Sequence, residues 1–222
     1  MVDTFNDREV EMLTYLRNTV VDPSGRGTAT TETFAAAGTQ TTFTLTNTLV
    51  KSISSVLVNG VAKYIGYDYS VSYGEGAGVT TITLRVAPGD GISVVIAYRY
   101  GTAMIYYGFQ RLDSELPRIA IIPENYTPRM MSIGEQSDGT GKWIYYDCTY
   151  TAEIRSRFAK QLKSLSLEFA NAINLFRQST PQPHRMVIVS VNNIKPEDFD
   201  NDLRLYRSQV NFTITYMFKF KD

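Results

Sequence analysis

The chain has 222 residues, and its 22 Lys and Arg residues equal its 22 Asp and Glu residues, so the formal net charge is zero. This balance disfavours a protein that binds long nucleic acids or anionic membranes through its overall charge. The chain is long enough to bury one large core or two small ones, and we expect two. Its single cysteine, Cys148, cannot form an internal disulfide, which favours a reducing compartment.

We expect a chain that is soluble where it is made. No apolar run reaches about eighteen residues, the length that a membrane-spanning helix needs. The N-terminal residues include Asp3, Asp7, Glu9 and Glu11, whereas a signal peptide begins with basic and then apolar residues. The sequence therefore predicts neither a membrane span nor a signal peptide.

The N-terminal segment predicts one amphipathic helix followed by a linker. Asn6 and Glu9 resemble a capping pair, and Pro23-Ser24-Gly25 ends the helical pattern. The apolar residues of this helix are Val10, Leu13, Leu16 and Val20. The next segment, Gly25 to Gln40, is rich in Gly, Thr and Ala and poor in large apolar groups. It predicts a flexible linker or a lead-in to a strand.

From Phe43 to Tyr100, short β-branched runs alternate with turn residues. Asn59-Gly60 lies between two apolar runs, which is the strongest short signal for a hairpin because a tight primed turn needs positive φ at both central residues. The charged residues of this stretch cancel, so it does not predict a phosphate-binding surface. We expect a small all-β module.

Two alternating strands and one helix dominate the C-terminal half. The first strand, Trp143 to Ile154, turns Ile144, Tyr146, Cys148, Tyr150, Ala152 and Ile154 to one face. The second strand turns Val210, Phe212, Ile214, Tyr216, Phe218 and Phe220 to one face. Between them, a helix over about residues 156–178 is predicted to cover this apolar face with Phe158, Leu162, Leu165, Phe169, Ile173 and Phe176.

Together these elements predict an α+β fold. We expect an antiparallel or mixed sheet covered by one long helix plus the N-terminal helix, with an inserted all-β, sandwich-like domain. Pro117 to Pro123 predicts a short strand at a sheet edge, and Pro196 to Asp202 predicts an acidic loop. We expect residues 1–27 and 102–222 to form the α+β domain and residues 28–101 to form the inserted module.

Two glycine-rich segments do not fit phosphate-binding motifs. The segment Gly134 to Lys142 has Gln136 where a phosphate loop needs its first glycine, and Trp143 follows the lysine where that loop needs Ser or Thr. Gly74 to Gly78 lies between two strands, so no helix N-terminus follows to receive a pyrophosphate. Hairpin tips are the better interpretation of both segments.

Neither metal ligation nor catalysis is predicted. Asp198, Asp200 and Asp202 match the first ligand positions of a calcium loop, but Leu203 replaces its glycine and Gln209 its closing glutamate. A nucleophilic dyad of Cys148 with the only histidine, His184, would require the thiol to leave the core face. We therefore expect no enzymatic activity and no catalytic, cofactor-binding or metal-binding residues.

Part of the chain resembles a β-sandwich module that is widespread in structural proteins of tailed bacteriophages. The resemblance lies in three stretches: Ser55-Val56-Leu57-Val58-Asn59-Gly60, Tyr67-Asp68-Tyr69-Ser70-Val71, and the segment Ala87 to Tyr98 with its Ala-Pro-Gly-Asp-Gly turn. It covers roughly a third of the chain. An extra glycine-containing spacing around Asp90-Gly91 departs from the pattern at the last turn.

The order of the remaining elements, with Leu-Pro-Arg-Ile-Ala-Ile at Leu116 to Ile121, resembles the tail terminator (tail completion) family and related neck proteins. The resemblance implies a virion protein, made in the host cytoplasm, that forms a ring, usually a hexamer, at the head-proximal end of the tail. Its implied partners are copies of itself, the tail tube and the neck or connector proteins, with transient passage of double-stranded DNA and no membrane.

Three alternatives stay open at this point. The first is a baseplate, tail-tip or fibre-attachment structural protein, in which the β module binds a partner or a sugar. The second is a small hydrolase that uses Cys148 and His184. The third is a nucleic-acid binder, which a salt-sensitive shift with DNA would reveal.

Overall fold

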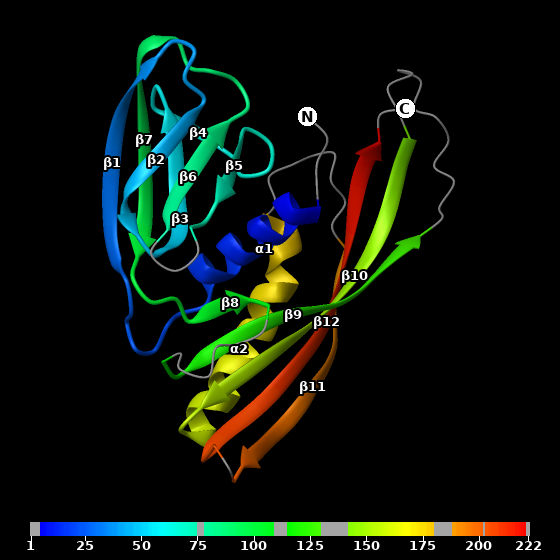
Figure 1. Ribbon diagram of the computed structural model, residues 1–222. Coiled ribbons are helices and arrows are strands. Elements are labelled where there is room, and N and C mark those ends of the chain that lie inside the picture. The colour runs from blue at the N-terminus through cyan, green and yellow to red at the C-terminus, as the bar shows by residue number, and fades with distance from the viewer. Residues whose placement is uncertain are drawn as a thin grey trace. The chain divides into compact units, whose positions relative to one another are not determined.

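The computed structural model describes the chain over residues 5–74, 78–108, 115–129, 142–179, 188–201 and 203–220. The chain divides into two compact units, Asn6–Ala103 and Met104–Asp222, with Met1–Phe5 assigned to the second (Figure 1). Helices and several β-sheets are present, so the predicted α+β class is confirmed. Among the described helices, none is long and apolar enough to cross a membrane.

The first unit contains one helix and two antiparallel sheets. Its elements are α1 (Phe5–Thr19), β1 (Thr28–Ala37), β2 (Thr42–Thr48), β3 (Val50–Val58), β4 (Val61–Lys63), β5 (Tyr69–Ser72), β6 (Val79–Leu84) and β7 (Asp90–Tyr100). The strand orders are β1-β7-β3-β4 and β2-β6-β5. Buried residues of both sheets, such as Phe43 and Ile82 from one and Ile53 and Ile96 from the other, form one core. The unit is therefore a β-sandwich.

The predicted hairpin at Asn59-Gly60 is confirmed. Val58 at the end of β3 pairs with Val61 at the start of β4, so the two intervening residues form the whole loop. Asn59 has φ 50° and Gly60 has φ 75°, which is the positive-φ pair that a primed turn requires. Asparagine and glycine adopt this conformation at lower cost than other residues.

Helix α1 belongs with the β-sandwich. Thr14 shares a 2.7 Å hydrogen bond with Tyr73, and Arg17 and Asn18 donate to the backbone carbonyls of Lys51 and Ile53 at 2.9 and 2.8 Å. The sequence had grouped residues 1–27 with residues 102–222, whereas these contacts group α1 with the strands that follow it. Apolar periodicity shows which face of a helix is buried, but it does not identify the element that buries it.

Strand β1 replaces the expected linker. Thr28 to Ala35 pair with β7 without interruption, although this segment has few large apolar side chains. The prediction of a flexible linker or strand lead-in was wrong over these residues because it counted only the surface that the segment itself could bury. Pairing with β7 satisfies the backbone groups, and threonine suits a half-exposed strand.

The second unit contains a five-stranded mixed sheet and one helix. Its elements are β8 (Ile105–Tyr107), β9 (Arg118–Arg129), β10 (Lys142–Ser156), α2 (Ala159–Ser179), β11 (Ile188–Asp200) and β12 (Leu205–Phe220). The strand order is β11-β12-β10-β9-β8, and only the β8–β9 pair is parallel among these strands. Strand β9 is longer than expected, because it continues to Arg129, and the prediction of an edge strand was wrong at Ile119 to Ile121, where β8 pairs on its outer side.

The predicted apolar face of this sheet is confirmed over most of the residues whose side chains are described; the exception is Tyr146, which is half-buried, while Tyr145 on the opposite face is buried. Cys148, Tyr150, Ala152 and Ile154 of β10 are fully buried, as are Val210, Phe212 and Ile214 of β12. The α2 stripe is likewise buried at Leu162, Leu165, Phe169, Ile173 and Phe176, and the Phe169 ring meets the Phe212 ring edge-on at 5.9 Å. This packing is the core of the unit.

Phe158 departs from the predicted stripe. Its side chain is 66% exposed, because α2 begins one residue later at Ala159. The Ser156 hydroxyl accepts the Phe158 N–H at 3.1 Å and donates to Gln161 at 2.5 Å, which fixes the entry to the helix. Phe158 therefore lies before the helix, outside its periodic face.

The predicted acidic loop is mostly strand. Strand β11 runs to Asp200, with irregular pairing between Lys195 and Asp198, and Asp198 lies opposite Arg207 of β12. The ion pair between Asp198 and Arg207, 3.3 Å long, offsets the low intrinsic β-propensity of aspartate at this position. The prediction of a loop over Pro196 to Asp202 was therefore wrong over residues 196–200.

We expect Phe169→Ala to destabilise the second unit by about 3–5 kcal/mol, because it removes a fully buried ring from the contact between α2 and β12. Leu167→Ala, on the same helix but 50% exposed, is the matched control and should change the stability by less than about 1 kcal/mol. Urea unfolding can be followed by the fluorescence of the single tryptophan, Trp143, which lies in β10. Equal effects of the two substitutions would contradict the packing described.

Candidate functional site

The face of the five-stranded sheet that points away from α2 carries hydroxyl and amide side chains from four strands. Successive cross-strand rows place Ser190, Thr213, Thr149 and Asn125 side by side, and Asn193 beside Asn211 and Thr151. We call this surface the hydroxyl–amide face. It comprises Asn125, Thr127, Thr149, Thr151, Ser190, Asn192, Asn193, Asn211, Thr213 and Thr215.

Side-chain hydrogen bonds connect neighbouring strands across the hydroxyl–amide face. The Thr151 hydroxyl bonds to the Glu124 carboxylate and lies 2.8 Å from the Asn211 amide oxygen. Thr215 donates to Asp147 at 2.5 Å. On the β11 side, Ser190 donates to Asn192, which donates in turn to Thr213, both at 2.8 Å. These bonds fix the side chains in place and give the face a defined pattern of donors and acceptors.

Among the residues whose side chains are described, the positive charges on this side of the sheet lie in two adjacent rows near its end, with Lys195 opposite Gln209 in one row and three arginines in the other. Arg118, Arg155 and Arg207 lie directly opposite one another on three adjacent strands, an arrangement that like charges disfavour. Two carboxylates compensate it, because Glu153 accepts from Arg155 at 2.6 and 2.8 Å and Asp198 pairs with Arg207 at 3.3 Å. Arg155 and Arg207 are thus each engaged with a carboxylate, and the rows of threonine and asparagine carry no cation.

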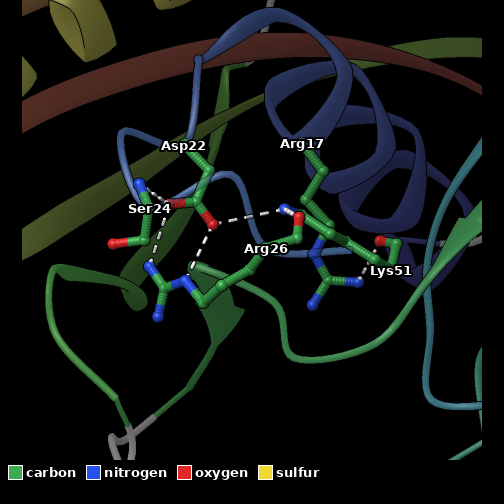
Figure 2. A network of polar contacts seen from close by, with 5 residues as sticks. All are labelled: Arg17, Asp22, Ser24, Arg26 and Lys51. Carbon is green, nitrogen blue, oxygen red and sulfur yellow. Dashed lines mark hydrogen bonds and ion pairs between the residues drawn. The ribbon is translucent and has the colours of Figure 1, made fainter. Parts of the chain in front are cut away.

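A polar network around Asp22 is the densest ionic cluster in the first unit (Figure 2). Arg26 donates to both carboxylate oxygens at 2.8 and 3.2 Å, the Ser24 N–H donates at 3.0 Å, and Lys51 Nζ lies 3.4 Å away. Lys51 also donates to the Arg26 carbonyl at 2.9 Å, and Arg17 donates to the Lys51 carbonyl. The network ties the end of α1, the following loop and β3 together.

Burial and the neighbouring opposite charges shift the pKa values of Asp22 and Lys51 in opposite directions. Burial raises the pKa of Asp22, but the Arg26 side-chain bond, the Ser24 N–H and the charges of Arg26 and Lys51 outweigh it, so the pKa lies below its ordinary value. Burial lowers the pKa of Lys51, and the neighbouring Asp22 only partly opposes this. The side chains of Asp22, Arg26 and Lys51 are 6–9% exposed, so the network is a buried structural clamp.

The residues considered above for catalysis, phosphate binding or metal binding lie partly within the described residues and partly outside them. Cys148 is fully buried on the core face of β10, as predicted. His184, the segment Gly134–Gly141 and Asp202 lie outside the described residues. Asp200 accepts the Leu203 N–H at 3.1 Å and so forms a turn. Over the described residues, no group of three or more His, Cys, Asp or Glu side chains is arranged to hold a metal ion.

Part of the glycine-rich segment after β5 is also described. A Cβ on Gly74 would lie 2.3 Å from the backbone of Gly78, so the two glycines allow a close approach of the chain to itself. The Gly74 N–H donates to the Thr80 hydroxyl at 3.2 Å. These contacts agree with the hairpin interpretation of the segment, whose residues 75–77 lie outside the described part.

The hydroxyl–amide face was predicted only in part. Alternation places Thr149, Thr151, Asn211, Thr213 and Thr215 on the outer side of their strands, and the structure confirms this. The contributions of β9 and β11 were missed, because prolines and acidic residues hide the alternation of these strands. The Asp22 clamp was missed because its members come from three separate elements.

No protein-family model matches the chain, and no curated protein or solved structure matches it significantly. The resemblance to phage tail and neck proteins therefore stays a prediction.

We expect Asp22→Asn to destabilise the first unit by about 3 kcal/mol at pH 7, because it leaves the buried Lys51 and Arg26 charges without a carboxylate. The folded pKa of Asp22 is depressed, so the stability it contributes is complete above the ordinary value of 3.8 and is lost as the pH falls through the depressed value. The difference between variant and wild type should therefore stay constant down to about pH 4 and shrink below it.

Amide hydrogen exchange in β3 measures this difference, since β3 carries Lys51. Ser24→Ala is the matched control, because Ser24 joins the clamp through its backbone N–H. An Asp22→Asn variant as stable as the Ser24→Ala variant at pH 7 would show that the clamp contributes nothing.

We expect the Cys148 thiol to react with an aromatic disulfide reagent only when the second unit unfolds, because the side chain is fully buried. Reaction of the native protein should be slow, and urea should accelerate it in parallel with the change in Trp143 fluorescence. Rapid modification in the absence of urea would instead favour an accessible, reactive cysteine of the kind that a hydrolase needs.

Proposed function

We propose that the protein is a virion structural protein that forms a homo-oligomeric ring at the head-proximal end of a viral tail or in the neck. In this role it joins the tail tube to the head connector and lets the genome pass. The hydroxyl–amide face is the observation that carries the proposal. It offers an ordered polar surface, four strands wide, on the side of the sheet opposite α2, and its threonine and asparagine rows contain no cation, only the hydrogen-bonded carboxylates of Glu124 and Asp147.

The chemistry of this face suits a ring through which DNA moves. Affinity for nucleic acid comes chiefly from Lys and Arg at the phosphates, and each such contact slows passage. The rows of threonine and asparagine supply no cation, and Arg155 and Arg207 at the end of the sheet are engaged with Glu153 and Asp198. A face of this kind can border a channel without holding the DNA.

The two-unit organisation also supports the proposal. The unit that contains β9, β10, α2 and β12 has the element order that resembles tail terminators, and the sandwich includes the stretches that resemble the phage module. Exposed apolar side chains on α2, namely Leu167 at 50% and Leu175 at 48%, lie eight residues apart on one side of the helix. Neighbouring copies in a ring would bury such residues.

We expect the purified protein to form rings, with a mass of about six times 25.0 kDa by light scattering and sixfold symmetry in negative-stain images. In such a ring each copy contacts its two neighbours through two different surfaces, and burial of the α2 leucines in this contact favours the closed assembly. A trimer would favour the baseplate, tail-tip or fibre-attachment alternative, and a strict monomer at high concentration would contradict both. A mobility assay with double-stranded DNA is the second measurement, and a strong, salt-sensitive shift would favour a nucleic-acid binder.

A further inference from the structure

The sheets of this protein differ in how their edge strands are protected from pairing with a further strand. An edge strand presents unpaired N–H and C=O groups, and proteins protect such edges with prolines, lysines, bulges, short strands or covering elements. In the described part of the chain, the longest open edges are those of β1, of β11 and of the part of β9 beyond Ile121, where its pairing with β8 ends. These three edges differ in how they are protected.

Both long edges of the second unit carry protective features. Strand β9 contains Pro123 and Pro128, and its pairing with β10 shifts register between them. Strand β11 has two irregularities in its pairing with β12, and the second of them includes Lys195, Pro196 and Asp198. Prolines, bulges and charges of this kind discourage a further strand from joining.

The edge of the first unit opposite β1 is also covered. The short β4 pairs with the end of β3, and the earlier part of β3 is covered from α1, where Arg17 and Asn18 donate to the carbonyls of Lys51 and Ile53. In the other sheet, the Thr46 N–H of the edge strand β2 is taken up by the Glu32 carboxylate at 3.0 and 3.2 Å. At both of these edges, side chains thus form hydrogen bonds with backbone groups of the strand.

Strand β1 has none of these features over its first eight residues. It pairs regularly with β7 from Thr28 to Ala35, contains neither proline nor lysine, and has exposed side chains at Ala29, Thr31 and Thr33. Its only charged residue, Glu32, bonds to Thr46 and to the Tyr98 hydroxyl. The described residues provide no strand on its outer side.

We infer that β1 pairs in antiparallel orientation with β1 of a second copy of this chain. Two identical edges can approach only if they do not oppose like charges. The exposed side chains of the first eight residues of β1 are Thr and Ala, and the Glu32 carboxylate is engaged with Thr46 and the Tyr98 hydroxyl of its own chain. Threonines facing one another across such a pair can also hydrogen-bond. The contact is two-fold, so it cannot close a ring of six and goes beyond the proposed function, joining copies whether or not they also form the ring.

Thr31→Lys tests the contact, and Ser55→Lys is its matched control. Both residues are exposed and lie opposite Ala97 on the same face of the same sheet, but Ser55 is on β3, an interior strand. We expect Thr31→Lys to weaken two-fold association at least about tenfold, because it places a flexible charge at the edge, and Ser55→Lys to leave it unchanged. Sedimentation velocity over a dilution series measures the association, and circular dichroism checks that both variants fold.

Amide hydrogen exchange gives an independent readout. In the wild-type protein, protection of the β1 amides should rise with protein concentration, because pairing occupies the outward N–H groups. Equal association of the two variants, or β1 protection that does not depend on concentration, would overturn the inference and leave a sixfold ring untouched. A wild-type protein that stays monomeric throughout the series would overturn the inference and the proposed ring together, and a strand of a different protein would then be the better occupant.

Discussion

Alternation of side chains between the two faces of a strand is the constraint on which both units depend. In the second unit it assigns one face of β10 and β12 to apolar residues, and α2 covers that face through the contact of Phe169 with Phe212, which itself stacks on Tyr150. The opposite face is left to threonine and asparagine. In the first unit the two sheets cover each other's apolar faces, so no long helix is needed for the core.

Sheet edges impose a second constraint, and the protein meets it mostly with side chains. Arg17 and Asn18 donate to carbonyls along β3, Glu32 accepts an N–H of β2, and prolines interrupt β9. The hydrogen bonds from Arg17 and Asn18 also explain the position of α1, because the last turns of this helix are polar where they meet β3. The helix therefore has two roles in the sandwich, since Val10 packs against the core and the Arg17 and Asn18 side chains cover an edge.

Much of the fold could be predicted from the sequence where one pattern acts alone. The alternation of β10 and β12, the stripe of α2 and the turn at Asn59-Gly60 are local patterns, and the structure confirms them. Strand β1 could not be predicted in this way, because its order comes from pairing with β7, more than fifty residues away. The same holds for the grouping of α1, which depends on hydrogen bonds to β3.

In the candidate site, too, some features follow from local sequence patterns and others from contacts between distant segments. Its threonines on β10 and β12 follow from alternation, but the hydroxyl–amide face becomes a surface only when β9 and β11 are placed beside them. The Asp22 clamp combines a loop, the Arg26 side chain and Lys51 of β3, and no sequence spacing marks such a cluster. Polar networks depend on distances between elements, which periodicity does not provide.

Several charges of the chain are compensated within the clusters described. Asp22 meets Arg26 and Lys51, Glu153 meets Arg155, and Asp198 meets Arg207. On the hydroxyl–amide face the Glu124 and Asp147 carboxylates are hydrogen-bonded to threonines, and the exposed side chains of the first eight residues of β1 are uncharged. Surfaces of that kind associate through backbone and side-chain hydrogen bonds, which salt weakens little, and identical copies can meet on them without repulsion. The proposed assembly of identical copies requires contacts of this kind, which do not depend on a charged partner.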